Sequence, residues 1–384
     1  MERSLINPDQ TLLLFCVIAL ITAFLFVLDR RFNHPIISGS VLLLIIPPVL
    51  SNLYIIPFQA PAYDVLWEYG LPLSLPLVLL SANLKTIFTE TGPVLVGFLC
   101  AVVGAMVGAI VAYPILGGRL FSEEIAGTLT ASYVGGSLNF AATAQALNFD
   151  DPSVLTATLA ADNLMGAAFI VTVSSLAGLS FIQRRFRPEV SDGAPNGNVA
   201  KDIIAAAPIA PAPIAAADLA ALFALSFCIF GLGEFLESKI GLPAVSITTI
   251  TLLSIATGQV FPNFAARTKI AYDIGMVILF FVFISVFAGA NAGVAIANGP
   301  MILAFVAIMV TVQMLLVFIL SAFFKLRLSE AAIGLMAAAM GPSIAAAFAA
   351  SKGWRELVTP GILAGIFGYA IGNFAGFFVH FIVS

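Results

Sequence analysis

The sequence predicts an all-α polytopic membrane protein, and three observations support this fold class. The chain has 384 residues, of which 61% are hydrophobic and 9% are charged, and its mean hydropathy is +1.08. A membrane-spanning helix needs ~20 apolar residues, and the chain supplies about a dozen such stretches. The alternating pattern of an outer-membrane barrel is absent. These observations exclude an ordinary soluble domain.

One long polar stretch, residues 183–217, divides the apolar segments into two series, and we expect it to be a surface linker. Residues 1–182 and 218–384 would then form two structural repeats. The three cysteines show neither metal-binding nor disulfide spacing. The expected helical segments are 11–28, 36–56, 71–89, 93–116, 124–147, 153–180, 219–237, 242–260, 272–296, 300–324, 329–350 and 357–383.

The two series share landmarks in the same order. An ordered set of matches with a nearly constant offset indicates an internal duplication. The matches, at offsets of 206 to 208 residues, are His34-Pro35-Ile36 with Leu242-Pro243-Ala244, Gly92-Pro93 with Gly299-Pro300, Ser122-Glu123 with Ser329-Glu330, Gly166 with Gly372, and Gly135-Gly136-Ser137 with Gly341-Pro342-Ser343. Asn83 and Asn291 also lie late in matching segments of the two halves.

The match between residues 135–137 and 341–343 interrupts an apolar segment midway in each half. Glycine permits a sharp turn, and proline removes a backbone donor that would lack a partner. Non-helical backbone at membrane depth is tolerated only where it lines a cavity or is buried in protein. A matched pair of breaks is therefore typical of a transport site between two repeats.

The distribution of basic residues favours a re-entrant hairpin at each break, because lysine and arginine prefer cytoplasmic loops. If segments 124–147 and 329–350 each enter and leave on one side, only Arg3, Arg119 and Lys239 of the 16 basic residues lie outside. Five crossings and one hairpin per half then invert the second repeat and place both termini outside. Two broken helices that cross fully are the alternative.

Asp162 is the one acidic residue well inside an apolar segment. A carboxylate at that depth is costly unless paired or hydrated, and is a functional candidate by default. It could bind Na⁺, accept a proton or contact a cationic group, with Asn163 beside it; the alternative is a structural carboxylate bonded to a hairpin. The other candidate binding residues are Gly135, Gly136, Ser137, Asn139, Thr143, Gly341, Pro342 and Ser343, and, with helix–helix hydrogen bonding as the alternative, Asn83 and Asn291.

Three motifs resemble those of the YjcL-type family of bacterial integral membrane proteins. They are Val134-Gly-Gly-Ser-Leu-Asn139, Asp162-Asn163 and Met340-Gly-Pro-Ser343, and the resemblance covers nearly the whole chain. That family is grouped with the cation–proton antiporters and related anion and organic-solute transporters. Gly341-Pro342 departs from the paired glycines of the citrate and glutamate carriers in this superfamily.

The resemblance implies an elevator-like architecture, in which a core moves against a scaffold, often in a homodimer. The scaffold would comprise residues 11–56 and 219–260, and the core residues 71–180 and 272–383.

These features predict a secondary active transporter rather than an enzyme. No nucleotide-binding motif is present, so we expect coupling to Na⁺ or H⁺, no other cofactor and no nucleic-acid partner. The freed N–H groups at the tips suit an anionic or zwitterionic solute such as an amino acid, a short peptide or a carboxylate. The expected location is a bacterial inner membrane. The alternatives are a Na⁺/H⁺ antiporter using Asp162 and, remotely, an intramembrane serine protease, for which Ser137 lacks a nearby histidine.

Overall fold

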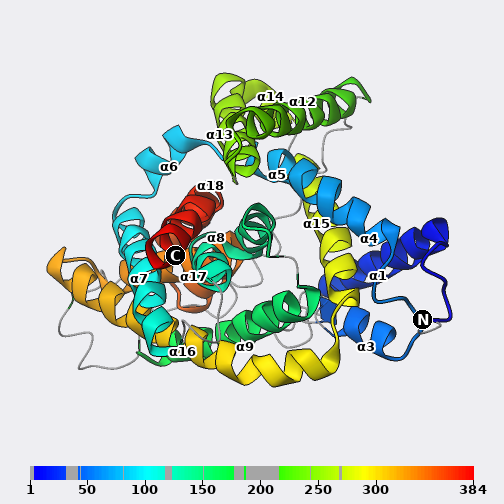
Figure 1. Cartoon of the computed structure of the whole chain (residues 1–384). Helices are drawn as coiled ribbons and strands as arrows, with labels where there is room; N and C mark the ends of the chain where they lie inside the picture. The colour runs from blue at the N-terminus through cyan, green and yellow to red at the C-terminus, as the bar shows by residue number, and fades with distance from the viewer. Residues whose placement is uncertain are drawn as a thin grey trace.

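The computed structural model describes residues 4–31, 42–43, 45–80, 82–116, 123–149, 151–176, 186, 216–242, 244–267 and 270–384. Every regular element within these ranges is a helix (Figure 1). The predicted linker, residues 183–217, lies outside them except at residues 186, 216 and 217.

Eight of the described helices are long and apolar enough to cross a membrane. A ninth candidate is bent by 51° and joins residues 61–79 to α6 (Leu84–Glu90). The chain is therefore a polytopic helical membrane protein, as its composition predicts. The eight helices are α1 (Thr11–Arg31), α7 (Pro93–Leu116), α9 (Pro152–Leu176), α12 (Ala216–Ile240), α15 (Ile270–Ala288), α16 (Ala292–Phe323), α17 (Leu328–Ser351) and α18 (Val358–Val383).

The remaining described helices are shorter or less apolar. The stretch 61–79 consists of α4 (Pro61–Val65), a π-helical turn (Leu66–Gly70) and α5 (Leu71–Leu79). The others are α3 (Ile46–Asn52), α8 (Glu123–Ala146), α13 (Val245–Val260) and α14 (Pro262–Arg267).

The helices pack in two groups. In one group α8, α17 and α18 lie together at the centre, and α7, α9 and α16 border them (Figure 1). In the other group α15 packs against α1, α3, α4 and α5, while α12 and α13 pack against each other and against α5. Thus α5 and α15, which we expected in a moving core, pack with helices of the expected scaffold; the division into core and scaffold itself stays a prediction.

In the second half, the interruption between α15 and α16 comes earlier in the chain than the sequence suggests. We expected one segment to end at residue 296 and the next to begin at Pro300, but α15 ends at Ala288 and α16 starts at Ala292. Pro300 lies inside α16, because neighbouring helices can compensate for the backbone hydrogen bond that proline removes. In the first half, by contrast, the chain does break at Gly92, where φ is 56°, and α7 begins at Pro93.

The matched asparagines Asn83 and Asn291 are helix N-caps. The Asn83 side chain accepts a hydrogen bond from the backbone N–H of Thr86 at 3.1 Å, at the start of α6. The Asn291 side chain accepts from the N–H groups of Gly293 and Val294, at 2.9 and 3.3 Å, at the start of α16. Such caps contribute ~1 kcal/mol each to helix stability, so the correspondence between these two residues has a structural cause.

The connection between α5 and α6 and the connection between α15 and α16 each receive a hydrogen bond from an amide side chain in the opposite half of the chain. Asn52, at the end of α3, donates to the carbonyl of Ala290 at 2.9 Å. Gln259, near the end of α13, donates to the carbonyl of Ala82 at 2.6 Å. We call these two bonds the crossed amide bonds. Their reciprocity is the pattern that a duplicated chain produces, and the inversion of the repeats across the membrane remains a prediction.

Replacing Gln259 by leucine should destabilise the fold. The carbonyl of Ala82, a residue only 1% exposed, would lose this donor, which costs about 1–3 kcal/mol. The apparent melting temperature of the purified protein in detergent measures the effect. Asn298→Ala is the matched control, because among the described residues the exposed Asn298 amide bonds only to Val294 of its own helix. Equal melting of Gln259→Leu and the unmodified protein would contradict the prediction.

Candidate functional site

Helix α8 is a hairpin of two helical arms. Its backbone leaves the helical conformation at Gly135 (φ −140°, ψ 15°) and Gly136 (φ 70°, ψ −169°). A methyl group built on Gly127 would lie 3.1 Å from Cδ1 of Leu147, whereas a straight helix would separate these residues by about 30 Å. The chain therefore reverses at Gly136, where the positive φ favours glycine.

Helix α17 reverses in the same way. Its break is at Gly341 (φ 80°, ψ −179°), directly before Pro342. A methyl group on Gly361 of α18 would lie 2.8 Å from Cγ2 of Ile333 and 3.4 Å from Cβ of Ala345. In a straight helix Ile333 and Ala345 would be about 18 Å apart, so α17 also folds back. Its length and composition alone would suit a helix that crosses the membrane.

The backbone fixes which tip residues are equivalent. Gly136 and Gly341 both have a positive φ, so the backbone conformation pairs Gly136 with Gly341. The sequence offset of 206 instead pairs Gly135 with Gly341, one residue away. In both hairpins the second arm begins immediately after this glycine, at Ser137 and at Pro342.

Helix α18 packs against both hairpins through its glycines. A methyl group on Gly365 would lie 2.5 Å from the backbone N of Pro342, and Gly368 faces the backbone of Val134 and Gly135. Further along, a methyl group on Gly376 would lie 2.6 Å from the carbonyl of Gly127. The glycine face of this helix thus brings the two tips within one helical turn of each other.

Tyr369 lies between the two tips. A methyl group on Gly136 would lie 3.8 Å from Cε1 of Tyr369, and one on Gly341 would lie 3.6 Å from its hydroxyl oxygen. The sequence analysis missed this residue. Its only sequence signal is a tyrosine within the glycine-rich α18, and α18 cannot be placed beside the tips without the fold.

Ser137 and Ser343 are exposed at the tips. Both side chains are accessible, and neither hydroxyl forms a hydrogen bond among the described residues. The backbone N–H groups at the start of each second arm point the positive end of a helix dipole towards the tip. Two exposed hydroxyls and two helix N-termini therefore lie at the tips, where they can donate hydrogen bonds to an anionic group.

Asn139 and Thr143, two further candidate residues, are instead fully buried. The Asn139 amide donates to the carbonyls of Gly135 at 3.1 Å and Gly368 at 3.0 Å. The Thr143 hydroxyl donates to the Asn373 side chain at 3.2 Å. These contacts hold the first hairpin to α18.

Asp162 on α9 lies between the two hairpins and is 8% exposed. The Ser132 hydroxyl, on the first arm of α8, donates to its carboxylate at 2.6 Å. One turn along α9, a methyl group on Gly166 would lie 3.1 Å from Cε of Met340, beside the second tip. No basic side chain of the described residues pairs with Asp162, so its charge is available to a cation or a proton.

Asn163 has a local role, since its amide donates to the carbonyl of Leu159 in the same helix at 2.8 Å. The part of the chain that the structure describes contains no group of three or more His, Cys, Asp or Glu residues arranged to hold a metal ion.

The fold and this arrangement define a polytopic helical membrane protein, with two glycine-tipped hairpins that meet on a common helix. Residues 16–384 match the family described as "Protein of unknown function (DUF819)". The chain is also 32% identical over 392 residues to the "Uncharacterized membrane protein YjcL" of Bacillus subtilis (strain 168), with 98% of each chain covered. The chain belongs to the DUF819 family.

Gly365→Ala should separate α18 from the second tip and destabilise the protein. The added methyl group meets backbone atoms of Pro342 that cannot rotate away, and overpacking of this kind costs about 1–3 kcal/mol. Gly231→Ala in α12 is the matched control, because a methyl group there meets none of the described residues within 4 Å and should stabilise its helix by about 0.5–1 kcal/mol. Thermal unfolding should show opposite shifts; shifts of the same sign would contradict the assignment.

Proposed function

We propose that this protein is a secondary active transporter of a small organic solute, coupled to Na⁺ or H⁺. The observation that carries the proposal is the convergence of two glycine-tipped hairpins on Tyr369. Irregular backbone within an apolar protein is costly, and two matched breaks that meet at one side chain are well explained by a ligand that binds there.

The chemistry of the tips favours an anionic or zwitterionic solute. N-terminal helix ends stabilise a carboxylate or similar group, and the exposed hydroxyls of Ser137 and Ser343 can donate hydrogen bonds to it. A zwitterion would add an ammonium group, which the nearby Asp162 carboxylate attracts. Amino acids, short peptides and small carboxylates have this chemistry.

The transport cycle would move the hairpins and α18 relative to the second group of helices. We propose inverted repeats, re-entrant hairpins from opposite sides, an elevator-like movement and a homodimer in a bacterial inner membrane, with both termini outside. The close packing of α18 against both hairpins supports movement of this part as a unit.

A screen of the purified protein by thermal shift, with and without Na⁺, tests the binding proposal. A solute that binds the native state raises its stability by mass action. Ser137→Ala with Ser343→Ala should weaken the binding of that solute, by about 1 kcal/mol or fivefold in Kd for each hydroxyl. Ser175→Ala is the control, because the Ser175 hydroxyl is exposed and bonds to Val171 of its own helix. Unchanged affinity in the double variant would contradict binding at the tips.

Asp162→Asn should separate solute binding from ion coupling. The amide keeps the shape of the side chain but loses the charge that a cation or proton requires. In proteoliposomes we expect uptake that no longer depends on Na⁺ or pH, whereas Asp9→Asn, at an exposed site, should behave as the unmodified protein. Ion coupling that survives the change would exclude Asp162. Exchange of Na⁺ for H⁺ without any solute would instead favour the antiporter alternative.

A further inference from the structure

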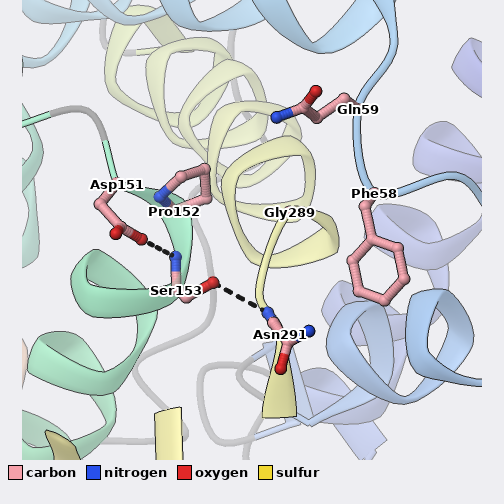
Figure 2. A pocket seen from close by; sticks show the side chains of 7 residues that line it. All are labelled: Phe58, Gln59, Asp151, Pro152, Ser153, Gly289 and Asn291. Carbon is pink, nitrogen blue, oxygen red and sulfur yellow. Dashed lines mark hydrogen bonds between the residues drawn. The ribbon is translucent and has the colours of Figure 1, made fainter. Parts of the chain in front are cut away.

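Two adjacent cavities lie away from the hairpin tips, where the two groups of helices meet. The larger has a volume of about 540 Å³ and lies between α9, the α15–α16 break and the segment before α4 (Figure 2). The smaller has a volume of about 240 Å³ and lies between α4, α9 and α15. Pro152 lines both, so we treat them as one crevice, here called the acidic crevice.

Two carboxylates line the acidic crevice, and none of the described residues that line it is a lysine or an arginine. The Asp64 side chain is exposed and forms no hydrogen bond or ion pair among the described residues. Asp151 caps α9 by accepting from the N–H groups of Ser153 and Val154, at 2.9 and 3.1 Å. The Asp151 carboxylate is engaged in this cap, whereas the Asp64 carboxylate has no hydrogen-bond partner among the described residues, so Asp64 is the more available of the two to a ligand.

The rest of the lining is suited to an organic cation rather than to a bare metal ion. The aromatic side chains Phe58, Tyr63, Trp67 and Phe149 contribute to the crevice, and their ring faces attract an ammonium group. Tyr63 is only 6% exposed, and its hydroxyl forms no hydrogen bond among the described residues. A hydroxyl of a mostly buried side chain that has no partner and lines a pocket is an acceptor available to a ligand.

The polar groups across the larger cavity complete this environment. Figure 2 shows Gln59 opposite Asp151 and Ser153, and the Ser153 hydroxyl accepts from the backbone N–H of Asn291 at 3.0 Å. This bond joins the start of α9 to the start of α16, so the wall formed by these two helix ends is held in place. Gln59 is exposed and its amide oxygen can accept a further hydrogen bond from a ligand N–H.

We propose that the acidic crevice binds the ammonium group of an organic amine, between the Asp64 carboxylate and the aromatic side chains around it. This site is separate from the hairpin tips, and the proposal does not rest on the proposed transport function. The crevice lies between the two groups of helices, so an amine bound there contacts both.

The chain provides its own reporter for a test, because it contains only two tryptophans and Trp67 lines the crevice. Trp354→Phe removes the other, which packs on Phe348, where phenylalanine preserves an aromatic contact. The full-length variant in detergent is titrated with tetramethylammonium chloride, and separately with NaCl at the same ionic strength. We expect a saturable fluorescence change with tetramethylammonium alone, and a matching heat of binding by calorimetry.

Charge-removing variants then locate the site. Asp64→Asn should raise the half-saturating concentration at least tenfold. Asp151→Asn should raise it about threefold, since asparagine keeps the helix cap and removes only the charge. Asp9→Asn, outside the crevice, should leave it unchanged.

The proposal is overturned if neither fluorescence nor calorimetry detects saturable binding of tetramethylammonium. It is also overturned if Asp64→Asn binds tetramethylammonium as tightly as the protein with Asp64 intact, or if Asp9→Asn weakens binding as much as Asp64→Asn does. The same fluorescence response to NaCl as to tetramethylammonium chloride would overturn it as well. Loss of solute binding at the tips in the serine variants, with amine binding retained, would distinguish the two sites.

Discussion

The close approach of α18 to the two hairpins is the interaction on which the rest of the structure depends. Gly365 contacts Pro342, and Gly368 contacts the backbone at Val134 and Gly135. Within apolar surroundings the hydrophobic effect adds little between helices, so association relies on van der Waals contact between backbones. The glycines permit that contact, and their spacing along one helix sets the distance between the tips.

The breaks create a second constraint, because they free backbone groups inside an apolar protein. At the first hairpin two amide side chains meet this need. Asn139 donates to the carbonyls of Gly135 and Gly368, and the fully buried Gln313 donates to those of Tyr133 and Ala101, at 3.3 and 3.1 Å. These amides stabilise the first turn, which leaves the exposed hydroxyl of Ser137 for a ligand.

The sequence predicted the helical membrane class and the position of both breaks, because glycine and proline act locally on the backbone. It could not separate tip residues that face a ligand from those that face α18, since that depends on the partner helix. For this reason Asn139 and Thr143 were expected at the binding site but are buried against α18, and Tyr369 was not expected there. Likewise, Asn83 and Asn291 appeared as matched polar residues, but their capping role required knowledge of where α6 and α16 begin.

The position of α18 in the chain has a consequence for biosynthesis. The hairpin α8 leaves the ribosome well before α18, the helix against which both of its arms pack. At about 5–20 residues per second, α8 would wait ~10–40 s for that partner. During this interval the Asn139 amide has no Gly368 carbonyl to meet, and the hairpin lacks its main contact surface. Synthesis of α18 is thus also the step that allows the centre of the protein to assemble.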